Sequence, residues 1–378
     1  MSDKAFDQQM MRKALERARR ARPSPNPPVG AVVVDADGQL VAAAHHLEAG
    51  TPHAEMAALQ EARDAARGGT LYVTLEPCNH EGRTPPCVDA ILASGVTRVV
   101  VGCLDPNPHV AGGGAERLRA AGITVDIGVA AVESRTLIAP WAKFITTGMP
   151  HVALKLALSL DGRIASRSGA SKWVTGPEAR AKVQELRARC DAVAVGIGTA
   201  VQDDPRLTVR DRTLLPEGKN PVRIVLDSQL RLPLGSRLVT TAPQVPTWVL
   251  TTEQGSPEAE AALVDAGCTV MRVAASAEGR VDVPAALRAI AERGVVSALF
   301  EGGAELIGSL LAGQLADELH AFVAPLLLGP RGRSGVVDWA GPETPAEAPR
   351  IDSPSWEVCG QDAYAFGVIH YPDRESQS

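Results

Sequence analysis

One histidine, two cysteines and a glutamate in the first quarter of the chain have the types and the order of a catalytic zinc site. His53-Ala-Glu55 comes first, Pro77-Cys78 follows, and Cys87 comes nine residues after Cys78. An imidazole and two thiolates are good zinc ligands, and a catalytic site leaves the fourth position to a water. Zinc lowers the pKa of such a water to about 7. Glu55 lies two residues from a ligand and can pass the water's proton to a departing nitrogen, so this group predicts a zinc-dependent deaminase.

The spacing of the two cysteines departs from the short form of the deaminase signature. That form has C-x-x-C, whereas eight residues separate Cys78 from Cys87 here. A closed structural zinc site is the alternative, with His80 as a possible fourth ligand. Because a closed site would leave no place for water, we expect His80 to contact the substrate instead.

A second set of polar residues lies in the later part of the chain. Lys155 interrupts an apolar strand segment, and a lysine there is seldom buried without a partner. We expect Asp203 to be its carboxylate partner, the alternative being a lysine on a solvated sheet edge. Phe300-Glu-Gly-Gly-Ala304 follows another apolar segment, and glycines before a helix suit a phosphate or dinucleotide cradle. The G-x-G-x-x-G spacing is absent, so a tight turn is the alternative for this segment.

Alternating helices and strands must position these residues. The periodicity predicts a helix over 54–67 that carries Glu55, a strand over 71–75 before Cys78, and a strand over 151–158 that carries Lys155. Repeated strand–helix alternation predicts an α/β fold with largely parallel pairing in both halves. Gly148-Met-Pro150 is the expected boundary. The expected domains are 1–147 and 148–372, and 373–378 is expected to be a loose tail.

Composition narrows the class of protein. A net charge of −6 and only one dense basic cluster argue against a nucleic-acid partner. With no signal-like start and no apolar run long enough to span a bilayer, we expect a cytoplasmic protein without a membrane partner. Four cysteines lie singly in or beside apolar stretches and are expected to pack as small hydrophobes: Cys103, Cys190, Cys268 and Cys359.

The motifs together resemble the bifunctional RibD family of riboflavin biosynthesis over residues 4 to about 371. The long cysteine spacing belongs to that resemblance, as Pro77-Cys-Asn-His-Glu-Gly-Arg-Thr-Pro-Pro-Cys87. Further matching stretches are Pro25-Asn-Pro27, Asp105-Pro-Asn-Pro108, Lys155-Leu-Ala-Leu-Ser-Leu-Asp-Gly-Arg163, Ser171-Lys-Trp-Val-Thr175, Asp203-Asp-Pro-Arg-Leu-Thr-Val-Arg210 and Glu301-Gly-Gly303. The resemblance implies a cytidine-deaminase-like three-layer domain, followed by an α/β domain similar to dihydrofolate reductase.

The resemblance also implies a reaction and its cofactors. The family deaminates 2,5-diamino-6-ribosylamino-4(3H)-pyrimidinone 5′-phosphate with one zinc ion, and then reduces the ribosyl group to ribityl with NADPH. Its substrate is thus a small phosphorylated pyrimidine, and its members are commonly homo-oligomers.

Site residues follow from the same match. In the deaminase half the substrate contacts would be Asn26, His46, His80, Arg83, Asp105 and Asn107. In the reductase half Lys155 and Asp203 would be catalytic, and the substrate contacts would be Ser171, Arg187, Arg206, Leu207, Arg210 and Glu301, with the three arginines at the 5′-phosphate. The NADPH contacts would be Ala157, Trp173, Thr199, Asp203, Ser228, Gly303, Ala304, Glu305, Leu306, Ile307, Gly308 and Ser309.

Two other functions compete with this interpretation. A tRNA adenosine deaminase shares the zinc residues, but it needs a basic footprint and typically the short cysteine spacing. A zinc-stabilised binding protein without catalysis is the second alternative. Glu55 argues against it, because a structural zinc site has no use for a carboxylate beside an open metal position.

Overall fold

The computed structural model describes residues 3–80, 85–108, 113–171, 173–215, 219–330, 332–334 and 337–372. The chain forms two compact units, Met1–Met149 and Pro150–Ser378. The tail expected at 373–378 lies outside the described residues. No helix within the described part is both long enough and apolar enough to span a membrane.

The first unit is built around a mixed sheet with the strand order β2-β1-β3-β4-β5. Its strands are β1 (Gly30–Val34), β2 (Leu40–His45), β3 (Thr70–Leu75), β4 (Arg98–Cys103) and β5 (Thr124–Ile127). β3, β4 and β5 run parallel, but β1 is antiparallel to both β2 and β3. The expectation of largely parallel pairing is therefore wrong for this unit. A tight turn closed by the Gly38 N–H on the Asp35 carbonyl joins β1 to β2, and so short a connection allows only a hairpin.

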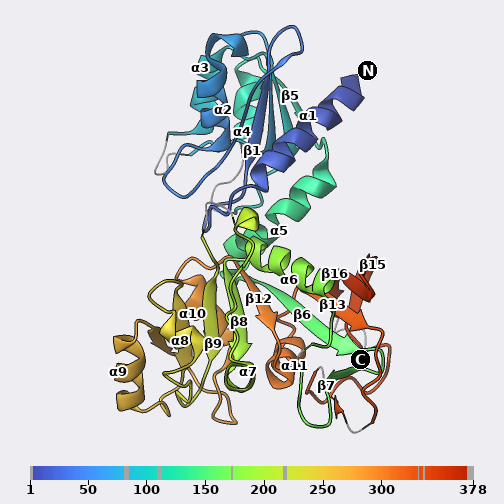
Figure 1. The fold of residues 1–378 in the computed structure, drawn as a ribbon. Coiled ribbons are helices and arrows are strands. Elements are labelled where there is room, and N and C mark those ends of the chain that lie inside the picture. The colour runs from blue at the N-terminus through green and yellow to red at the C-terminus, as the bar shows by residue number, and fades with distance from the viewer. Residues whose placement is uncertain are drawn as a thin grey trace. The chain divides into compact units, whose positions relative to one another are not determined.

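Helices cover both faces of this sheet, which gives three layers (Figure 1). α1 (Asp3–Ala18) packs Met11 and Leu15 against Val32 and Tyr72 of the sheet, and Leu137 of α5 joins the same cluster. The other face holds α2 (Ala54–Ala62), α3 (Cys87–Ser94) and α4 (Gly114–Ala120), and α5 spans Ala131–Thr147. The helix expected over 54–67 ends early: a 3-10 turn, Arg63–Ala66, follows α2, because Arg63 has a φ of 50°.

The second unit contains a nine-stranded sheet in the order β11-β10-β9-β8-β12-β6-β13-β16-β15. All of its pairings are parallel except those of β16 with β13 and β15. The strands are β6 (His151–Ser159), β8 (Ala192–Gly196), β9 (Val222–Leu226), β10 (Thr247–Thr251), β11 (Thr269–Arg272), β12 (Ser297–Glu301), β13 (Glu318–Ala324), β15 (Arg350–Cys359) and β16 (Asp362–His370). β7 (Arg163–Ala165) and β14 (Arg333–Ser334) form a separate two-stranded ladder.

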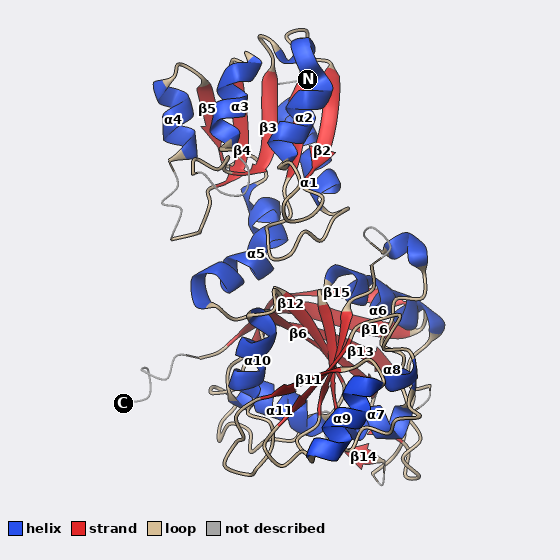
Figure 2. Cartoon of the chain, turned by 90° about the vertical axis from the view of Figure 1, so that its left-hand side faces the viewer, coloured by secondary structure: helices blue, strands red, loops and turns tan. Residues whose placement is uncertain are grey.

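Helices flank the large sheet, as Figure 2 shows. α6 packs Val183 and Leu186 on the face that carries Phe322 of β13 and Tyr364 of β16. A second core cluster joins Val193, Val225 and Val249 of neighbouring strands. The helices are α6 (Pro177–Arg189), α7 (Ile197–Asp203), the 3-10 turn Arg212–Leu214, α8 (Arg237–Thr240), α9 (Pro257–Asp265), α10 (Val283–Ala291) and α11 (Ala304–Ala312). The parallel strands thus end on one edge, where ligands bind in open α/β sheets.

Candidate functional site

The predicted zinc ligands meet at one point of the first unit. His53 is the residue before α2, Cys78 lies in the loop after β3, and Cys87 is the first residue of α3. The His53 Nδ1 atom lies 3.2 Å from the Cys87 Sγ and 3.6 Å from the Cys78 Sγ. Within the described residues these three form a cluster whose ligand atoms lie within 4.8 Å of one another. The donor set of one imidazole and two thiols is therefore arranged as zinc requires.

The environment of the cluster favours a thiolate at Cys78. Cys78 itself lies in the loop after β3 and not at a helix start. Its Sγ nevertheless accepts the backbone N–H of Cys87, at the start of α3, at 3.2 Å. A hydrogen bond from the Cys87 side chain, opposed by burial, holds the pKa of Cys78 well below its usual range. A deprotonated thiol is the form that binds a metal.

Glu55 lies beside this cluster and is almost completely buried, with 3% of its surface exposed. Burial raises its pKa to about 7. A carboxyl group with such a pKa can both accept and return a proton near neutral pH. A structural zinc site would not account for a carboxyl group held in this position.

His46 lies next to the expected zinc ligand His53, and Asn26 lies next to His46. The imidazole of His46 stands edge-on to that of His53, with 5.1 Å between the ring centres. Its Nε2 lies 2.9 Å from the Asn26 amide nitrogen and its Nδ1 lies 3.2 Å from the Pro52 carbonyl. Burial lowers the pKa of His46, so the neutral ring is favoured and its Nδ1–H can donate to Pro52 while Nε2 accepts from Asn26.

Asp105 and Asn107 form a turn after β4. One Asp105 carboxylate oxygen accepts the Asn107 N–H at 2.8 Å, and burial raises the pKa of Asp105. His80 is exposed and lies outside the metal cluster, which argues against it as a fourth ligand. Arg83 lies outside the described residues.

Glu76 is a site residue whose role the sequence analysis missed. It is 6% exposed, and its carboxylate accepts the Asp105 N–H at 3.2 Å and the Ala115 N–H at 3.1 Å. It therefore ties the loop before Cys78 to the loop of Asp105 and to α4. The signal available in the sequence was a carboxylate directly after a buried strand and two positions before a zinc ligand.

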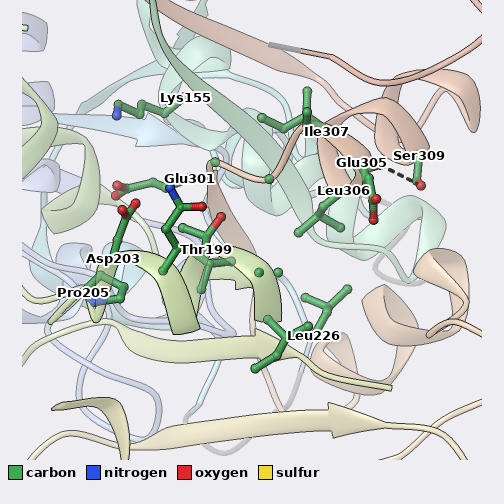
Figure 3. Close-up of a pocket in the computed structure, with 18 of the residues that line it drawn as sticks. Lys155, Thr199, Asp203, Pro205, Leu226, Glu301, Glu305, Leu306, Ile307 and Ser309 are labelled. Atoms are coloured by element: carbon green, nitrogen blue, oxygen red, sulfur yellow. Dashed lines mark hydrogen bonds between the residues drawn. The ribbon is translucent and has the colours of Figure 1, made fainter. Parts of the chain in front are cut away.

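A large cavity of about 1690 Å³ lies in the second unit, at the carboxyl ends of its parallel strands. Figure 3 shows Lys155, Asp203 and Glu301 gathered at one end of it and α11 residues toward the other. Every residue predicted for the reductase half lines this cavity: Lys155, Ala157, Ser171, Trp173, Arg187, Thr199, Asp203, Arg206, Leu207, Arg210, Ser228, Glu301, Gly303, Ala304, Glu305, Leu306, Ile307, Gly308 and Ser309.

Lys155 lies on β6, an interior strand that pairs with β12 and β13. The alternative of a lysine on a solvated sheet edge is therefore wrong. Burial lowers the pKa of Lys155, and the charge of Glu301, its register partner on β12, opposes that shift. Asp203 also acts on it electrostatically, and the Asp203 carboxylate accepts the Ser171 hydroxyl at 3.0 Å.

Arg187 and Glu301 form a two-pronged ion pair beside Lys155. Their contacts are 2.6 Å from Nε to Oε1 and 2.9 Å from the terminal nitrogen to Oε2. The remaining guanidinium nitrogen donates to the Thr208 carbonyl at 2.9 Å. Burial acts to raise the pKa of Glu301, but Arg187 outweighs burial and lowers it. Arg187 is thus already engaged, whereas the guanidinium groups of Arg206 and Arg210 have no hydrogen bond or ion pair within the described residues.

The glycines after β12 shape the other end of the cavity. Gly302 and Gly303 have φ angles of 73° and 87°, which other residues rarely adopt. They bring the backbone to the start of α11, whose first N–H groups have no partner inside the helix and can bind a phosphate. The side chains of Ser309 and Leu207 are otherwise occupied: the Ser309 hydroxyl donates to the Glu305 carbonyl, and Leu207 belongs to a core cluster. A ligand would therefore contact Ser309 and Leu207 through their backbone atoms.

Family models match both units. Residues 4–103 match the cytidine and deoxycytidylate deaminase zinc-binding region, and residues 150–365 match the RibD C-terminal domain. The first match contains all three residues of the metal cluster, and the second contains the whole reductase set.

Curated relatives and solved structures agree with these matches over almost the entire chain. The riboflavin biosynthesis protein RibD of Aquifex aeolicus is 42% identical over 86% of this chain and 88% of its own. The Escherichia coli RibD is 41% identical over 91% and 94%. The structure of Acinetobacter baumannii RibD superposes with a TM-score of 0.85 at 37% identity, over 97% of this chain and all of that one. The chain therefore belongs to the RibD family, the bifunctional enzymes of riboflavin biosynthesis that join a zinc-dependent deaminase to an NADPH-dependent reductase.

Proposed function

We propose that the first unit deaminates 2,5-diamino-6-ribosylamino-4(3H)-pyrimidinone 5′-phosphate and that the second reduces the product's ribosyl group to ribityl. The final product is 5-amino-6-ribitylamino-uracil 5′-phosphate. A Thermotoga maritima protein described as this deaminase and reductase superposes with a TM-score of 0.83 at 35% identity, over 98% of this chain. The observation that carries the proposal is the buried Glu55 beside the His53, Cys78 and Cys87 cluster.

In the deaminase site the three ligands fit zinc, which supplies a water activated for attack at neutral pH. Water adds to the ring carbon that bears the amino group, the carbon–nitrogen bond breaks, and ammonia leaves. Glu55 takes the water's proton and returns it to the departing nitrogen, which the raised pKa of this carboxyl group suits.

We assign the substrate contacts of this site to six residues. The Asn26–His46 pair lies beside the ring of His53, and Asp105 and Asn107 lie in the loop that Glu76 holds. Amides and carboxylates can read the edge of a pyrimidine, and a cation can bind its phosphate. We assign substrate contact to Asn26, His46, His80, Arg83, Asp105 and Asn107.

In the reductase site NADPH supplies a hydride to C1′ of the ribosyl group. The ring oxygen released from C1′ needs a proton, and Lys155, with its lowered pKa, can donate it. The Ser171 hydroxyl is hydrogen-bonded to the Asp203 carboxylate, and both residues line the same cavity as Lys155. We assign to this pair the binding of the ribosyl hydroxyl groups next to C1′.

The arginines of the cavity divide between two tasks. Arg206 and Arg210 carry guanidinium groups without a partner in the described part of the chain and suit the substrate's 5′-phosphate. Arg187 acts as a positioning residue, since its ion pair fixes the Glu301 carboxylate beside Lys155. This assignment changes the expected role of Arg187 from a phosphate contact to a support for Glu301.

NADPH would lie along the glycine segment and α11. The backbone N–H groups at the start of that helix suit its pyrophosphate. Trp173, which has the Arg180 guanidinium 4.5 Å from its ring centre, offers an exposed aromatic face near the reacting end. The proposed coenzyme contacts are Ala157, Trp173, Thr199, Asp203, Ser228 and Gly303 to Ser309.

A cytoplasmic location and a homo-oligomeric state stay predictions. Exposed Trp356 and Val358 on the last strand of the large sheet, β15, and Val368 on its neighbour β16 support the second of them. A solvent-exposed apolar group on an edge strand is typical of a surface that another chain covers.

The test follows ammonia and NADPH separately with the zinc-loaded protein. We expect ammonia without NADPH, and then NADPH oxidation equal to the ammonia formed. Glu55→Gln should lose at least 100-fold in ammonia release and keep one zinc, the usual range for removing a general acid–base being about 10²–10⁴. Glu61→Gln, an exposed change on the same helix α2, is the control. No ammonia release by wild-type protein that holds one zinc would contradict the deaminase assignment, and normal ammonia release by Glu55→Gln would contradict the role of Glu55. Ammonia without NADPH oxidation would contradict the reductase assignment.

A further inference from the structure

Three loops meet at the end of the cavity that lies beyond the carboxyl ends of β9 and β10, away from Lys155. They follow β9, β10 and β11 and carry Ser228 to Arg231, Gln254, and Ser276 to Asp282. The strand order β9-β8-β12-β6 puts this end three strand spacings, about 14 Å, from the strand that carries Lys155. A dinucleotide whose pyrophosphate lies at α11, after β12, would reach it with its adenosine half.

Hydrogen bonds hold the three loops together. The Ser228 Oγ accepts the Val281 N–H at 2.9 Å, and the Ser228 carbonyl accepts the Thr252 hydroxyl at 2.9 Å. The Gln229 amide donates to the Gln254 side-chain oxygen at 3.2 Å. Because Ser228 uses its oxygen lone pair on Val281, its hydroxyl hydrogen is still available to a ligand.

The loop after β9 has a backbone conformation that fixes the position of Arg231. Leu230 is 6% exposed and has a φ of 55°, a conformation that costs free energy for a branched residue. The Leu230 N–H and the Leu232 N–H are both held by Asp227, at 3.2 Å on its carbonyl and 2.8 Å on its carboxylate. The residue between them, Arg231, is exposed and lines the cavity.

The charges at this end single out Arg231. Arg280 pairs with Glu305 at 2.6 Å, and Arg237 pairs with Asp204 at 3.4 Å. Arg231 also lines the cavity, and its guanidinium has no acidic partner or hydrogen bond among the described residues. A cation without a partner is what a phosphate dianion requires, and arginine binds phosphate with two parallel hydrogen bonds.

We propose that Arg231, together with the Ser228 hydroxyl, binds the 2′-phosphate that distinguishes NADPH from NADH. The inference rests on the proposed placement of NADPH in this cavity. The carboxylate of Asp227, at the end of β9, does not oppose it. That side chain is fully buried under the loop and holds the Leu232 N–H, so it cannot bind a ribose hydroxyl in place of the phosphate.

The experiment measures NADP⁺ and NAD⁺ binding to the full-length, zinc-loaded protein by isothermal titration calorimetry. In Arg231→Ala we expect NADP⁺ affinity to fall about 10- to 100-fold, the range for a charged hydrogen-bonded pair, and NAD⁺ affinity to stay within about twofold. Arg288→Ala removes an exposed arginine of α10 that does not line the cavity, and it should change neither affinity. Arg231→Gln, with a similar chain length, repeats the test if Arg231→Ala folds poorly by its thermal unfolding midpoint.

The outcomes separate this inference from the proposed function. Wild-type protein that fails to bind NADP⁺ would overturn the placement of the coenzyme and this inference with it. The role of Arg231 alone would be overturned if the wild type binds NADP⁺ and Arg231→Ala keeps the same affinity for it. The same conclusion would follow if Arg231→Ala loses affinity for NADP⁺ and NAD⁺ equally. As a second measurement, wild type should prefer 2′,5′-ADP to 5′-AMP, and Arg231→Ala should lose most of that preference.

Discussion

Lys155 is the residue whose ionisation should set the pH dependence of the reductase. Burial lowers its pKa from the ordinary value of 10.5, and the negative charge of Glu301 partly offsets that effect. A proton donor must be protonated, so activity should fall as the pH rises through the pKa of Lys155. We therefore expect kcat/KM for NADPH oxidation to decline at a pH below 10.5.

Glu301→Gln tests the effect of the Glu301 charge on the pKa of Lys155. It removes the charge that raises the pKa of Lys155, so the alkaline decline should move to lower pH, beyond any general loss of rate. Rates measured from pH 6 to 10, with the deaminated substrate supplied, report the shift. Glu292→Gln, at the end of α10 and outside the cavity, is the matched charge change. An unmoved decline in Glu301→Gln would show that another group titrates.

At the level of single residues, the sequence showed which residues belong to the sites better than it showed which side chains interact with one another. His53, Cys78 and Cys87 were recognisable because few sites besides a zinc site use an imidazole and two thiols in this order, and the structure brings their ligand atoms together. The engagement of Arg187 by Glu301 was not visible, since the two are 114 positions apart and meet only when α6 packs across β12. Glu76 was missed for the same reason: its hydrogen-bond partners lie on a loop and a helix far along the chain.

At the level of elements, α11 depends on a close contact that only glycine permits. A Cβ on Gly308 would lie 2.0 Å from the Asp338 carbonyl oxygen, while the Asp338 N–H donates to the Ala304 carbonyl at 3.0 Å. Alanine normally favours a helix by about 1 kcal/mol over glycine. Overpacking at a backbone contact reverses that preference and costs about 1–3 kcal/mol.

Gly308→Ala should therefore destabilise the second unit and weaken NADP⁺ binding, because α11 must shift. Thermal unfolding and calorimetric titration of NADP⁺ measure the two effects. Gly235→Ala is the control, since a Cβ there meets nothing within 4 Å and its φ is not positive. Equal behaviour of the two variants would show that α11 does not need this contact.

The elements that the sequence analysis missed are short, polar or at an edge. α7 has only seven residues and includes glycine and β-branched residues, so it lacks a helical pattern. β15 contains Pro354 and is mostly exposed, which only an edge strand tolerates. The buried parallel strands β6, β8, β9, β10 and β12 have almost continuous apolar runs, which is the pattern that predicts such strands from a sequence. What remained open was the pairing order, which depends on contacts between distant segments.

At the level of the whole molecule, the two chemistries occupy separate compact units. The zinc cluster lies within Met1–Met149, and every residue that lines the reductase cavity lies within Pro150–Ser378. The core clusters described for the second unit are made of that unit's own residues. Each unit can therefore be disabled by a change that leaves the other's side chains untouched.

Removing zinc should therefore abolish one activity and spare the other. Without the metal, the closely spaced ligands lose the charge that holds them together, so the first unit should unfold at a lower temperature as well as lose ammonia release. NADPH oxidation should continue within about twofold when the deaminated substrate is supplied. His53→Ala, assayed beside chelated wild type, checks that the loss comes from the site and not from the chelator, and added zinc should restore only the wild type. If zinc removal also stopped NADPH oxidation while NADP⁺ still bound, the second unit would depend on the first for catalysis, and the reductase site would be incomplete as assigned.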